Sequence, residues 1–208
     1  MRSNQRFSRR IWIAAAAALA ASGTVLSAAP ADAAVTTLPC ATRPVAWPFT
    51  PWGDPNAYYT LPGADFEGDL SDWTLQGGAA RTAGNEPWKV VAGTAASALD
   101  LPTGASATAR PMCVSSSEDS LRVFYRAPGD PGAALRITVH VTAGTYAADN
   151  TYLVQGGTAP GWTLSPRIMI PQLPIPTGQQ TMTVTFDETN TPAHWQVDDV
   201  QVDPWRTL

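Results

Sequence analysis

Apolar and polar residues alternate in short runs along much of the chain. In the clearest run, Leu135, Ile137, Val139 and Val141 alternate with polar side chains. A period of two with many β-branched residues is typical of half-buried β-strands. Comparable runs are Leu121–Tyr125, Thr181–Phe186 and Trp195–Val202, and weaker candidates are Trp73–Leu75, Trp88–Val91, Ser97–Leu101, Thr151–Val154 and Arg167–Ile170.

Turn residues separate these runs, and no segment after residue 33 has the 3.6-residue period of a helix. Eight or nine short strands divided by Pro, Gly, Asn and Asp are typical of a sandwich or a jelly roll. The pattern therefore predicts an all-β fold, an antiparallel β-sandwich.

The last run changes parity within its length. Trp195 and Val197 share one alternation, whereas Val200 and Val202 share the other. A strand that faces one core cannot change parity without an extra residue. We therefore predict a β-bulge at Asp198–Asp199, which would redirect these two carboxylates.

Residues 34–62 have a different composition, with six prolines and no strand pattern. Proline removes backbone donors, so this segment cannot form a central strand. Its aromatic content argues against disorder. We predict an arm over residues 34–62, packed on a sandwich domain of residues 63–208; the arm's aromatic residues are Trp47, Phe49, Trp52, Tyr58 and Tyr59.

Residues 1–33 have the features of a signal peptide. A head with four arginines precedes the apolar stretch Ile11–Leu26, and Ala31–Ala33 offers a cleavage site before Ala34. A membrane anchor is the alternative, but the apolar run is short and is broken at Ser22–Thr24. Ser8–Ile13 resembles a twin-arginine export signal, and an ordinary secretory signal is equally compatible with it. We expect a secreted, extracellular protein with no membrane segment after cleavage.

The net charge argues against one class of partner. The whole chain has a formal net charge of −4, and residues 34–208 carry nine basic and 16 acidic residues, a net charge of −7. Nucleic acids and anionic membranes are bound through basic surfaces. We therefore expect no nucleic-acid partner.

Two cysteines, Cys40 and Cys113, lie in the predicted exported part. An even number of cysteines in an oxidising compartment favours a disulfide, and two buried thiols are the alternative. A zinc site is not indicated, because the two histidines, His140 and His194, are distant in the sequence from both cysteines and from each other. A disulfide here would stabilise the fold by roughly 4 kcal/mol in the chain-entropy description.

Two motifs resemble a known family of domains. Asp65–Thr74 and His194–Val202 are similar to the opening and closing strands of galactose-binding-like jelly rolls, the fold of many carbohydrate-binding modules. Val197 replaces an isoleucine of that pattern, and Asp72 replaces a glycine. The chain also looks similar to secreted actinobacterial proteins of unassigned role that share its Arg-Pro-Val, Pro-Trp-Gly-Asp-Pro and Pro-Met-Cys-Val elements.

The resemblance implies a structural calcium ion between the first and last strands. Glu67 matches the glutamate of the motif, and Asp199 or Asp198 matches its aspartate. Backbone carbonyl groups near Asp65 or Gly68 would complete a set of oxygen ligands. Alternatively, these carboxylates cap turns or pair with Arg122, Arg126 or Arg136.

Tryptophan is abundant, and large aromatic side chains serve both cores and sugar-binding surfaces. Trp73, Trp162 and Trp195 lie in strand patterns, so we assign them to the core. The candidates for ligand contact lie in the arm or in loops, where covering the sandwich is their alternative role; they are Trp47, Trp52, Tyr58, Tyr59 and Trp88.

The sequence contains little that indicates catalysis. It has no serine-nucleophile elbow, no metal-binding histidine pair and no glycine-rich phosphate loop. Our first hypothesis is a secreted, non-catalytic module that binds a cell-wall or environmental polysaccharide. It predicts an exposed aromatic platform or a polar groove. The alternatives are a structural or adhesion domain that binds protein at the cell surface, and a small carbohydrate-active enzyme with two carboxylates across a cleft.

Overall fold

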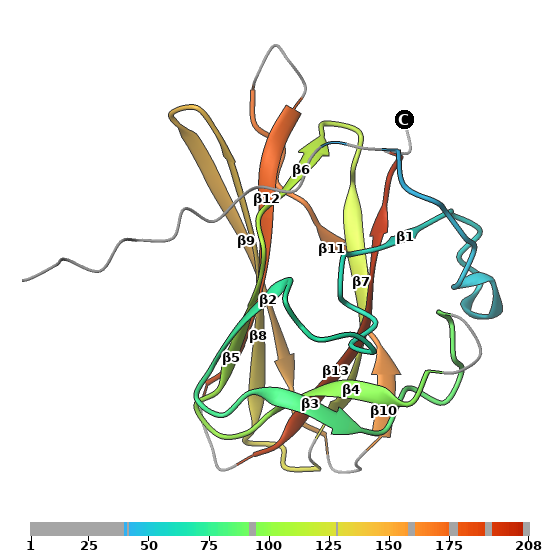
Figure 1. Ribbon diagram of the computed structural model, residues 1–208, viewed down its shortest axis with the longest axis vertical. Coiled ribbons are helices and arrows are strands. Elements are labelled where there is room, and N and C mark those ends of the chain that lie inside the picture. The colour runs from blue at the N-terminus through green and yellow to red at the C-terminus, as the bar shows by residue number, and fades with distance from the viewer. Residues whose placement is uncertain are drawn as a thin grey trace, which may run out of the picture. The chain divides into compact units, whose positions relative to one another are not determined.

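Two antiparallel sheets packed face to face make up the described part of the chain (Figure 1). The structure is a computed structural model that describes residues 40, 42–91, 95–127, 129–157, 161–174, 179–189 and 193–205. The predicted antiparallel β-sandwich is confirmed. The predicted signal peptide, residues 1–33, lies outside the described residues.

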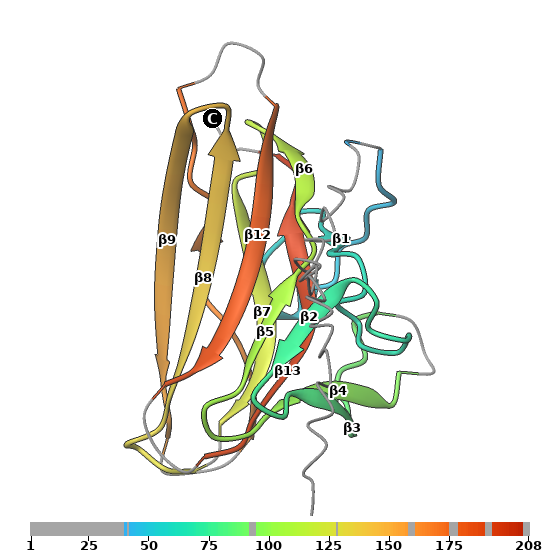
Figure 2. The same ribbon diagram turned by 60° about the vertical axis from the view of Figure 1, so that its left-hand side comes forward.

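One sheet has six strands in the order β2-β5-β12-β8-β9, and β6 also pairs with β12 (Figure 2). In β8 the predicted alternation is confirmed, because Ile137 and Val139 are buried while Arg136 lies on the outer face. The strands of this sheet are β2 (Trp73–Gln76), β5 (Ser106–Ala109), β6 (Met112–Ser115), β8 (Ala134–Ala143), β9 (Tyr146–Gln155) and β12 (Gln179–Glu188).

The other sheet has seven strands in the order β10-β7-β13-β4-β3, with β1 paired to β13 and β11 paired to β7. The predicted runs Leu121–Tyr125 and Trp195–Val202 lie in the central strands β7 and β13. The strands are β1 (Tyr59–Thr60), β3 (Ala80–Ala83), β4 (Ser97–Leu101), β7 (Ser120–Ala127), β10 (Gly161–Leu164), β11 (Ile168–Met169) and β13 (Trp195–Asp203).

The core lies between the two sheets, where apolar side chains from both inner faces meet. Trp73 stacks on Phe186 with ring centroids 5.8 Å apart, and Trp195 is fully buried. Both tryptophans therefore occupy the core, as predicted. Trp162 does not, because it is half-buried on the opposite side of the seven-stranded sheet, against Phe49 and Phe124.

The predicted bulge in β13 is confirmed. Its pairing with β7 shifts register between Asp198 and Gln201, and Asp199 has a φ of 48°. The extra residue lets Val197 and Val200 both face the core, where each is fully buried. The bulge also directs two adjacent carboxylates into the protein.

Residues 42–58 lie along the outer side of the seven-stranded sheet (Figure 1). They include one 3-10 turn, η1 (Thr50–Trp52), and a single bridge between Ala46 and Tyr58. A disulfide joins Cys40 to Cys113 in β6, which confirms the predicted pairing. The bond therefore connects a segment beside one sheet to a strand of the other sheet.

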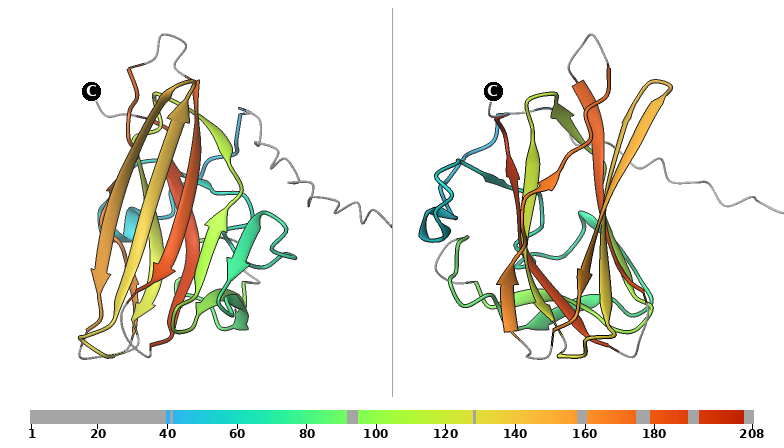
Figure 3. Two further views of the ribbon diagram at one scale, coloured as in Figure 1. Left: turned by 90° about the vertical axis from the view of Figure 1, so that its left-hand side faces the viewer. Right: turned by 180° about the vertical axis from the view of Figure 1, so that it is seen from behind.

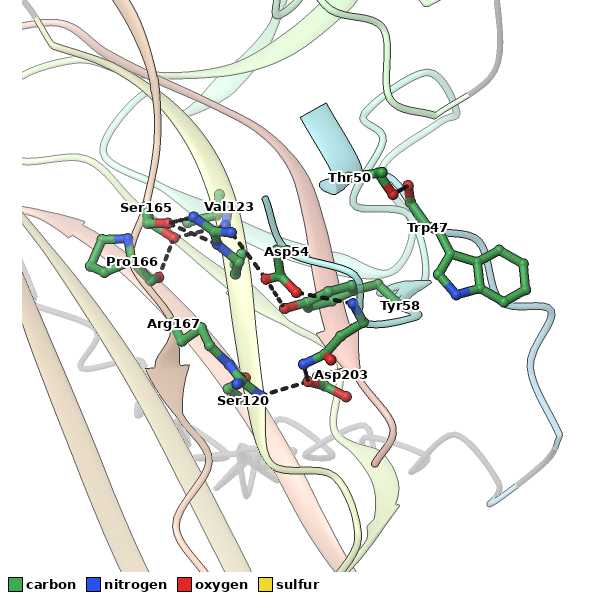
Figure 4. Close-up of polar contacts among 12 residues, drawn as sticks. Trp47, Thr50, Asp54, Tyr58, Ser120, Val123, Ser165, Pro166, Arg167 and Asp203 are labelled. Atoms are coloured by element: carbon green, nitrogen blue, oxygen red, sulfur yellow. Dashed lines mark hydrogen bonds and ion pairs between the residues drawn. The ribbon is translucent and has the colours of Figure 1, made fainter. Parts of the chain in front are cut away.

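Two aspartates, Asp54 of this segment and Asp203 of β13, take part in the contacts that fasten the segment to the sheet (Figure 4). Arg122 pairs with Asp54 at 3.1 Å, and Arg167 pairs with the buried Asp203 at 2.6 Å. Asp54 also accepts the Tyr58 hydroxyl at 2.8 Å, while Asp203 accepts the side-chain amide of Asn56 at 2.9 Å. Because breaking a buried, hydrogen-bonded pair is costly, these contacts hold the segment in one position.

Some short elements differ from the sequence prediction. The weak strand candidate Trp88–Val91 is wrong, because these residues form a turn followed by irregular chain. The strands β3, β5 and β6 were not predicted, since each has only four residues and lacks a run of large apolar side chains.

Candidate functional site

An exposed aromatic group lies on the outer side of the seven-stranded sheet. Trp88 stacks on Phe124 with ring centroids 5.3 Å apart and an interplanar angle of 27°. Trp52 meets the Trp88 ring nearly edge-on at 5.1 Å and the Phe124 ring at 5.6 Å. We call Trp52, Trp88 and Phe124 the tryptophan patch. Trp88 is 47% exposed, so the patch presents an indole surface whose position its neighbours fix.

Polar side chains border this patch. Trp162 of β10 packs against the same aromatic cluster and lies opposite Arg126 of β7. Arg126 donates to the side-chain oxygen of Gln196 at 3.1 Å. A guanidinium and an amide therefore flank the aromatic surface, and both groups can form hydrogen bonds with hydroxyl groups.

The Trp88 loop is held by a buried carboxylate that the sequence prediction missed. Glu86 is fully buried, and its two carboxylate oxygens accept the backbone N–H groups of Trp88 and Val90. The Glu86 N–H in turn donates to Asp198 at 3.1 Å. Lys89, with a φ of 52°, adopts a left-handed conformation that persists only where surrounding contacts enforce it. The loop is thus fixed to the bulge of β13.

The remaining aromatic candidates are not part of the patch. Trp47 is 61% exposed and lies away from the Tyr58 network (Figure 4). Tyr58 and Tyr59 are buried, so neither contributes to the exposed aromatic surface of the patch. Tyr58 meets Phe49 edge-on at 4.8 Å, beneath the segment that covers the sheet. Of the five candidates, the structure brings Trp52 and Trp88 together.

Glu67 has a structural partner that fits the turn-capping alternative. Its carboxylate accepts the N–H groups of Ala96 and Ser97 at 2.7 and 2.8 Å, at the start of β4. Arg81 donates to the carbonyl oxygens of Glu67 and Gly68 at 2.9 and 2.7 Å. Several of the oxygens expected to hold calcium therefore already accept protein hydrogen bonds.

Asp199 is the exception among the predicted carboxylates. It is fully buried, and neither of its carboxylate oxygens has a hydrogen-bond partner among the described residues. Burial raises the pKa of Asp198 to about 8. Burial and the charge of Asp198 raise the pKa of Asp199 further, and the charge of Glu86 adds to both. Such a group needs a proton or a cation, because buried charge must be compensated.

Among the predicted calcium ligands, only the side chain of Asp199 fits a bound cation. Within the described ranges, no group of three or more His, Cys, Asp or Glu side chains is arranged to hold a metal ion. The predicted trio of Glu67, Asp198 and Asp199 is therefore not gathered into one side-chain site. Asp199 fits, since its oxygens are buried without a partner, and backbone carbonyl groups would have to supply the other oxygen ligands.

The outer face of the six-stranded sheet carries a feature that only the strand register reveals. One threonine from each of five strands lies at the same level, so a row of hydroxyl and methyl groups crosses the sheet shown face-on in Figure 3 (left). Neighbouring pairs approach to 3.2 Å (Thr108 and Thr185) and 3.4 Å (Thr138 and Thr151). The row consists of Thr74, Thr108, Thr185, Thr138 and Thr151.

A shallow groove of about 260 Å³ lies at one end of this threonine row. It is lined by residues of β2, β5 and β12, and by Arg110, whose guanidinium pairs with Asp72 at 2.7 Å. This groove is lined mainly by apolar and hydroxyl groups, and Trp73 is the aromatic residue in its lining. It is thus chemically distinct from the tryptophan patch on the opposite side of the sandwich.

Comparisons with known proteins give structural neighbours only. No protein-family model and no curated protein sequence matches the chain. An arabinose-bound GH51 α-L-arabinofuranosidase is 18% identical, with a TM-score of 0.49 over 70% of this chain and 26% of that one. A xylan-binding domain from CBM 22 is 16% identical, with a TM-score of 0.44 over 74% of this chain and 99% of that one.

A family 11 carbohydrate-binding module from a Clostridium thermocellum cellulosomal cellulase is 14% identical, with a TM-score of 0.44. The match extends over 71% of this chain and 94% of that module. By contrast, the chain spans about a quarter of the arabinofuranosidase. Each likeness concerns the fold alone.

Among the residues that the structure describes, no helix is long and apolar enough to cross a membrane.

Proposed function

We propose that this domain is a secreted module that binds polysaccharide without acting on it, and that the tryptophan patch contacts the sugar. The observation that carries the proposal is the exposed Trp88 indole, stacked on Phe124 and buttressed by Trp52. Sugar rings present flat C–H faces, which pack on aromatic rings, while their hydroxyl groups need nearby polar partners. Arg126 and Gln196 supply such partners beside the patch.

The rigidity of the patch supports this role. A binding surface that is ordered before the ligand arrives loses less conformational entropy on binding. Trp88 is held by ring contacts on one side and by the Glu86 carboxylate at its backbone. The predicted signal peptide and the disulfide support a location outside the cell, where polysaccharides of cell walls and of the environment are accessible.

A binding assay with matched tryptophan variants tests the proposal. The mature domain is tested on a glycan array and in pull-down assays with insoluble polysaccharides. Trp88→Ala should weaken binding to the preferred polysaccharide at least about tenfold, since hot-spot aromatic residues contribute about 2 kcal/mol or more. Trp47→Ala is the matched control, because Trp47 is also an exposed tryptophan (61%, against 47% for Trp88) but lies outside the patch.

The outcomes separate the competing hypotheses. If Trp88→Ala binds like the wild type, the patch is not the binding surface. A loss of binding in Thr183→Lys instead would move the site to the groove beside the threonine row, which Thr183 lines. If the folded domain binds no glycan, the adhesion hypothesis, with a protein partner, takes the place of this one.

We further propose that a structural calcium ion compensates Asp199. The unpartnered oxygens of this buried residue support the proposal, and neighbouring backbone carbonyl groups would complete the ligand set. The ion would neutralise charge between the Glu86 loop and the bulge of β13. Calorimetric titration with Ca²⁺ tests it: Asp199→Asn should abolish binding, whereas Asp69→Asn, which alters an exposed carboxylate, should retain it. If addition of Ca²⁺ to the wild type produced no heat of binding, the result would contradict the proposal.

A further inference from the structure

A second cavity, separate from the tryptophan patch, lies beside the disulfide. Its volume is about 330 Å³, within the range of small-ligand sites. Four separate stretches of the chain form it: residues 42–45, Tyr59 of β1, the turn at 117–118, and the chain at 204–205. Arg43 donates to the carbonyl oxygen of Cys113 at 3.2 Å, so the cavity is bounded by chain that the disulfide holds in place.

Trp205 forms an aromatic wall of this cavity. Its side chain is 55% exposed, although an indole is among the most costly groups to leave in water. Its backbone N–H donates to Asp203 at 3.0 Å, and Asp203 is itself buried and paired with Arg167. The backbone of Trp205 is thus fixed at the rim of the cavity.

The interior of the cavity contains a polar group without a partner. Tyr59 is 3% exposed, and its hydroxyl oxygen is buried with no hydrogen-bond partner among the described residues. The Arg43 guanidinium lies over the Tyr59 ring, 4.8 Å from its centroid. Buried hydroxyl groups in proteins nearly always have a hydrogen-bond partner, so an unpaired one in the lining of a cavity points to a polar ligand.

The third chemical component is the buried carboxylate of Glu118. Ser115 and Ser117 hydroxyl groups donate to its Oε2 atom, which fixes its position. After burial, the charge of Glu118 is the main cause that raises the pKa of Tyr59, while Arg43 acts in the opposite direction. One positive and one negative side chain therefore line the cavity together, which disfavours a strongly charged ligand.

We propose that this cavity binds a single neutral pyranose, such as the end of a glycan chain, against the indole of Trp205. A pyranose matches the lining because it has an apolar C–H face for the indole and hydroxyl groups for Tyr59, Arg43 and Glu118. The proposal goes beyond the patch, and it shares with the proposed function only the class of ligand. It predicts that the domain recognises chain ends in addition to chain surfaces.

Titration with simple sugars tests the cavity directly. Methyl glycosides of neutral hexoses and pentoses are added to the ¹⁵N-labelled mature domain, and the tryptophan indole N–H signals are followed by NMR. At least one glycoside should shift the Trp205 signal in a saturable manner and leave the Trp88 signal unmoved at the same concentration. Assignment of the two signals comes from Trp205→Phe and Trp88→Phe variants.

Tyr59→Phe is the decisive variant, since it removes only the unpaired hydroxyl group. Its melting temperature should equal or exceed that of the wild type, because no protein hydrogen bond is lost. Its affinity for the glycoside should fall about two- to tenfold, the usual effect of one lost hydrogen bond. Tyr152→Phe, a change of the same kind in β9, should leave the affinity unchanged.

The results for the two sites are separable. No saturable shift at Trp205 with any neutral glycoside, or wild-type affinity in Tyr59→Phe, would overturn the cavity proposal. Either result would leave the polysaccharide binding of the patch intact. Conversely, a glycoside shift at Trp205 together with undiminished polysaccharide binding by Trp88→Ala would support the cavity and refute the patch.

Discussion

The carboxylate of Glu86 accepts the backbone N–H of Trp88, which fixes the exposed indole to a buried acidic residue two positions earlier in the chain. Glu86 connects the surface of the tryptophan patch to the bulge of β13, because its own N–H donates to Asp198. A change of charge at Glu86 or Asp198 should therefore affect the tryptophan patch.

We expect Glu86→Ala to destabilise the domain by about 2–4 kcal/mol, since it leaves the N–H groups of Trp88 and Val90 without acceptors. Polysaccharide binding should weaken as well, because the indole is no longer held. Urea unfolding and a binding isotherm measure the two effects. Asp69→Ala removes an exposed carboxylate that accepts one N–H, from Ser71, and should change neither quantity appreciably. An unchanged affinity in a folded Glu86→Ala variant would show that Trp88 does not depend on Glu86.

The buried aspartates of the bulge predict how stability depends on pH when divalent cations are chelated. Burial raises the folded-state pKa of Asp198 from 3.8 to about 8, so the folded chain keeps a proton that the unfolded chain releases. Stability from this source is complete below pH 3.8 and is lost as the pH rises through about 8. The melting temperature of the chelated protein should fall over this interval.

The comparison variant for the pH series is Asp198→Asn, which removes one of the two titrating groups and should weaken the pH dependence to the part that Asp199 contributes. Ca²⁺ should restore the melting temperature of the wild type most strongly at the alkaline end, where the carboxylates must ionise. A profile of the wild type that coincides with that of Asp198→Asn would rule out a raised pKa at this position.

Loss of the disulfide should destabilise the domain without unfolding its central strands. We expect the double variant Cys40→Ser, Cys113→Ser to lose roughly 2–5 kcal/mol, as is typical when a disulfide is removed from a small secreted domain. Chemical unfolding under oxidising conditions measures the loss. The cavity beside Arg43 should lose its glycoside affinity in the same variant, whereas the tryptophan patch should retain polysaccharide binding. Equal stability of the variant and the wild type would show that the bond adds no constraint.

Two glycines form a matched pair that tests the backbone packing. A Cβ atom on Gly156 would lie 1.9 Å from the carbonyl oxygen of Asp130, whereas one on Gly161 would meet no atom within 4 Å. Neither residue needs a left-handed conformation. Gly156→Ala should therefore cost about 1–3 kcal/mol through overpacking, and Gly161→Ala should be close to neutral. Thermal unfolding compares them, and equal melting temperatures would contradict the packing described here.

The long strands were predictable because alternation survives over many residues. In β8 and β12, a buried face and a polar face are fixed by the side chains themselves. The bulge was predictable for the same reason, since a change of parity between Val197 and Val200 has only one structural solution. The four-residue strands β3, β5 and β6 carry too few apolar side chains for this signal to appear.

The site was less predictable because its parts come together through tertiary contacts. Glu86 and Asp198 are 112 residues apart in the chain, and nothing in either local sequence indicates their contact. The burial of Tyr58 follows from the path of residues 42–58 over the sheet, which proline content alone does not determine. The threonine row likewise depends on the register of five strands, although the alternating threonines of β12 are visible in the sequence.

The disulfide also has a mechanical consequence. A force that pulls the chain at Cys40 and at its C-terminal side passes through the sulfur–sulfur bond to Cys113, so residues 41–112 bear none of the load. This shielded loop contains Trp52, Glu86 and Trp88. A domain stretched between an anchored polysaccharide and the rest of its surroundings would therefore carry no load along the chain that holds Trp52 and Trp88, whereas Phe124, the third residue of the patch, lies in the loaded strand β7.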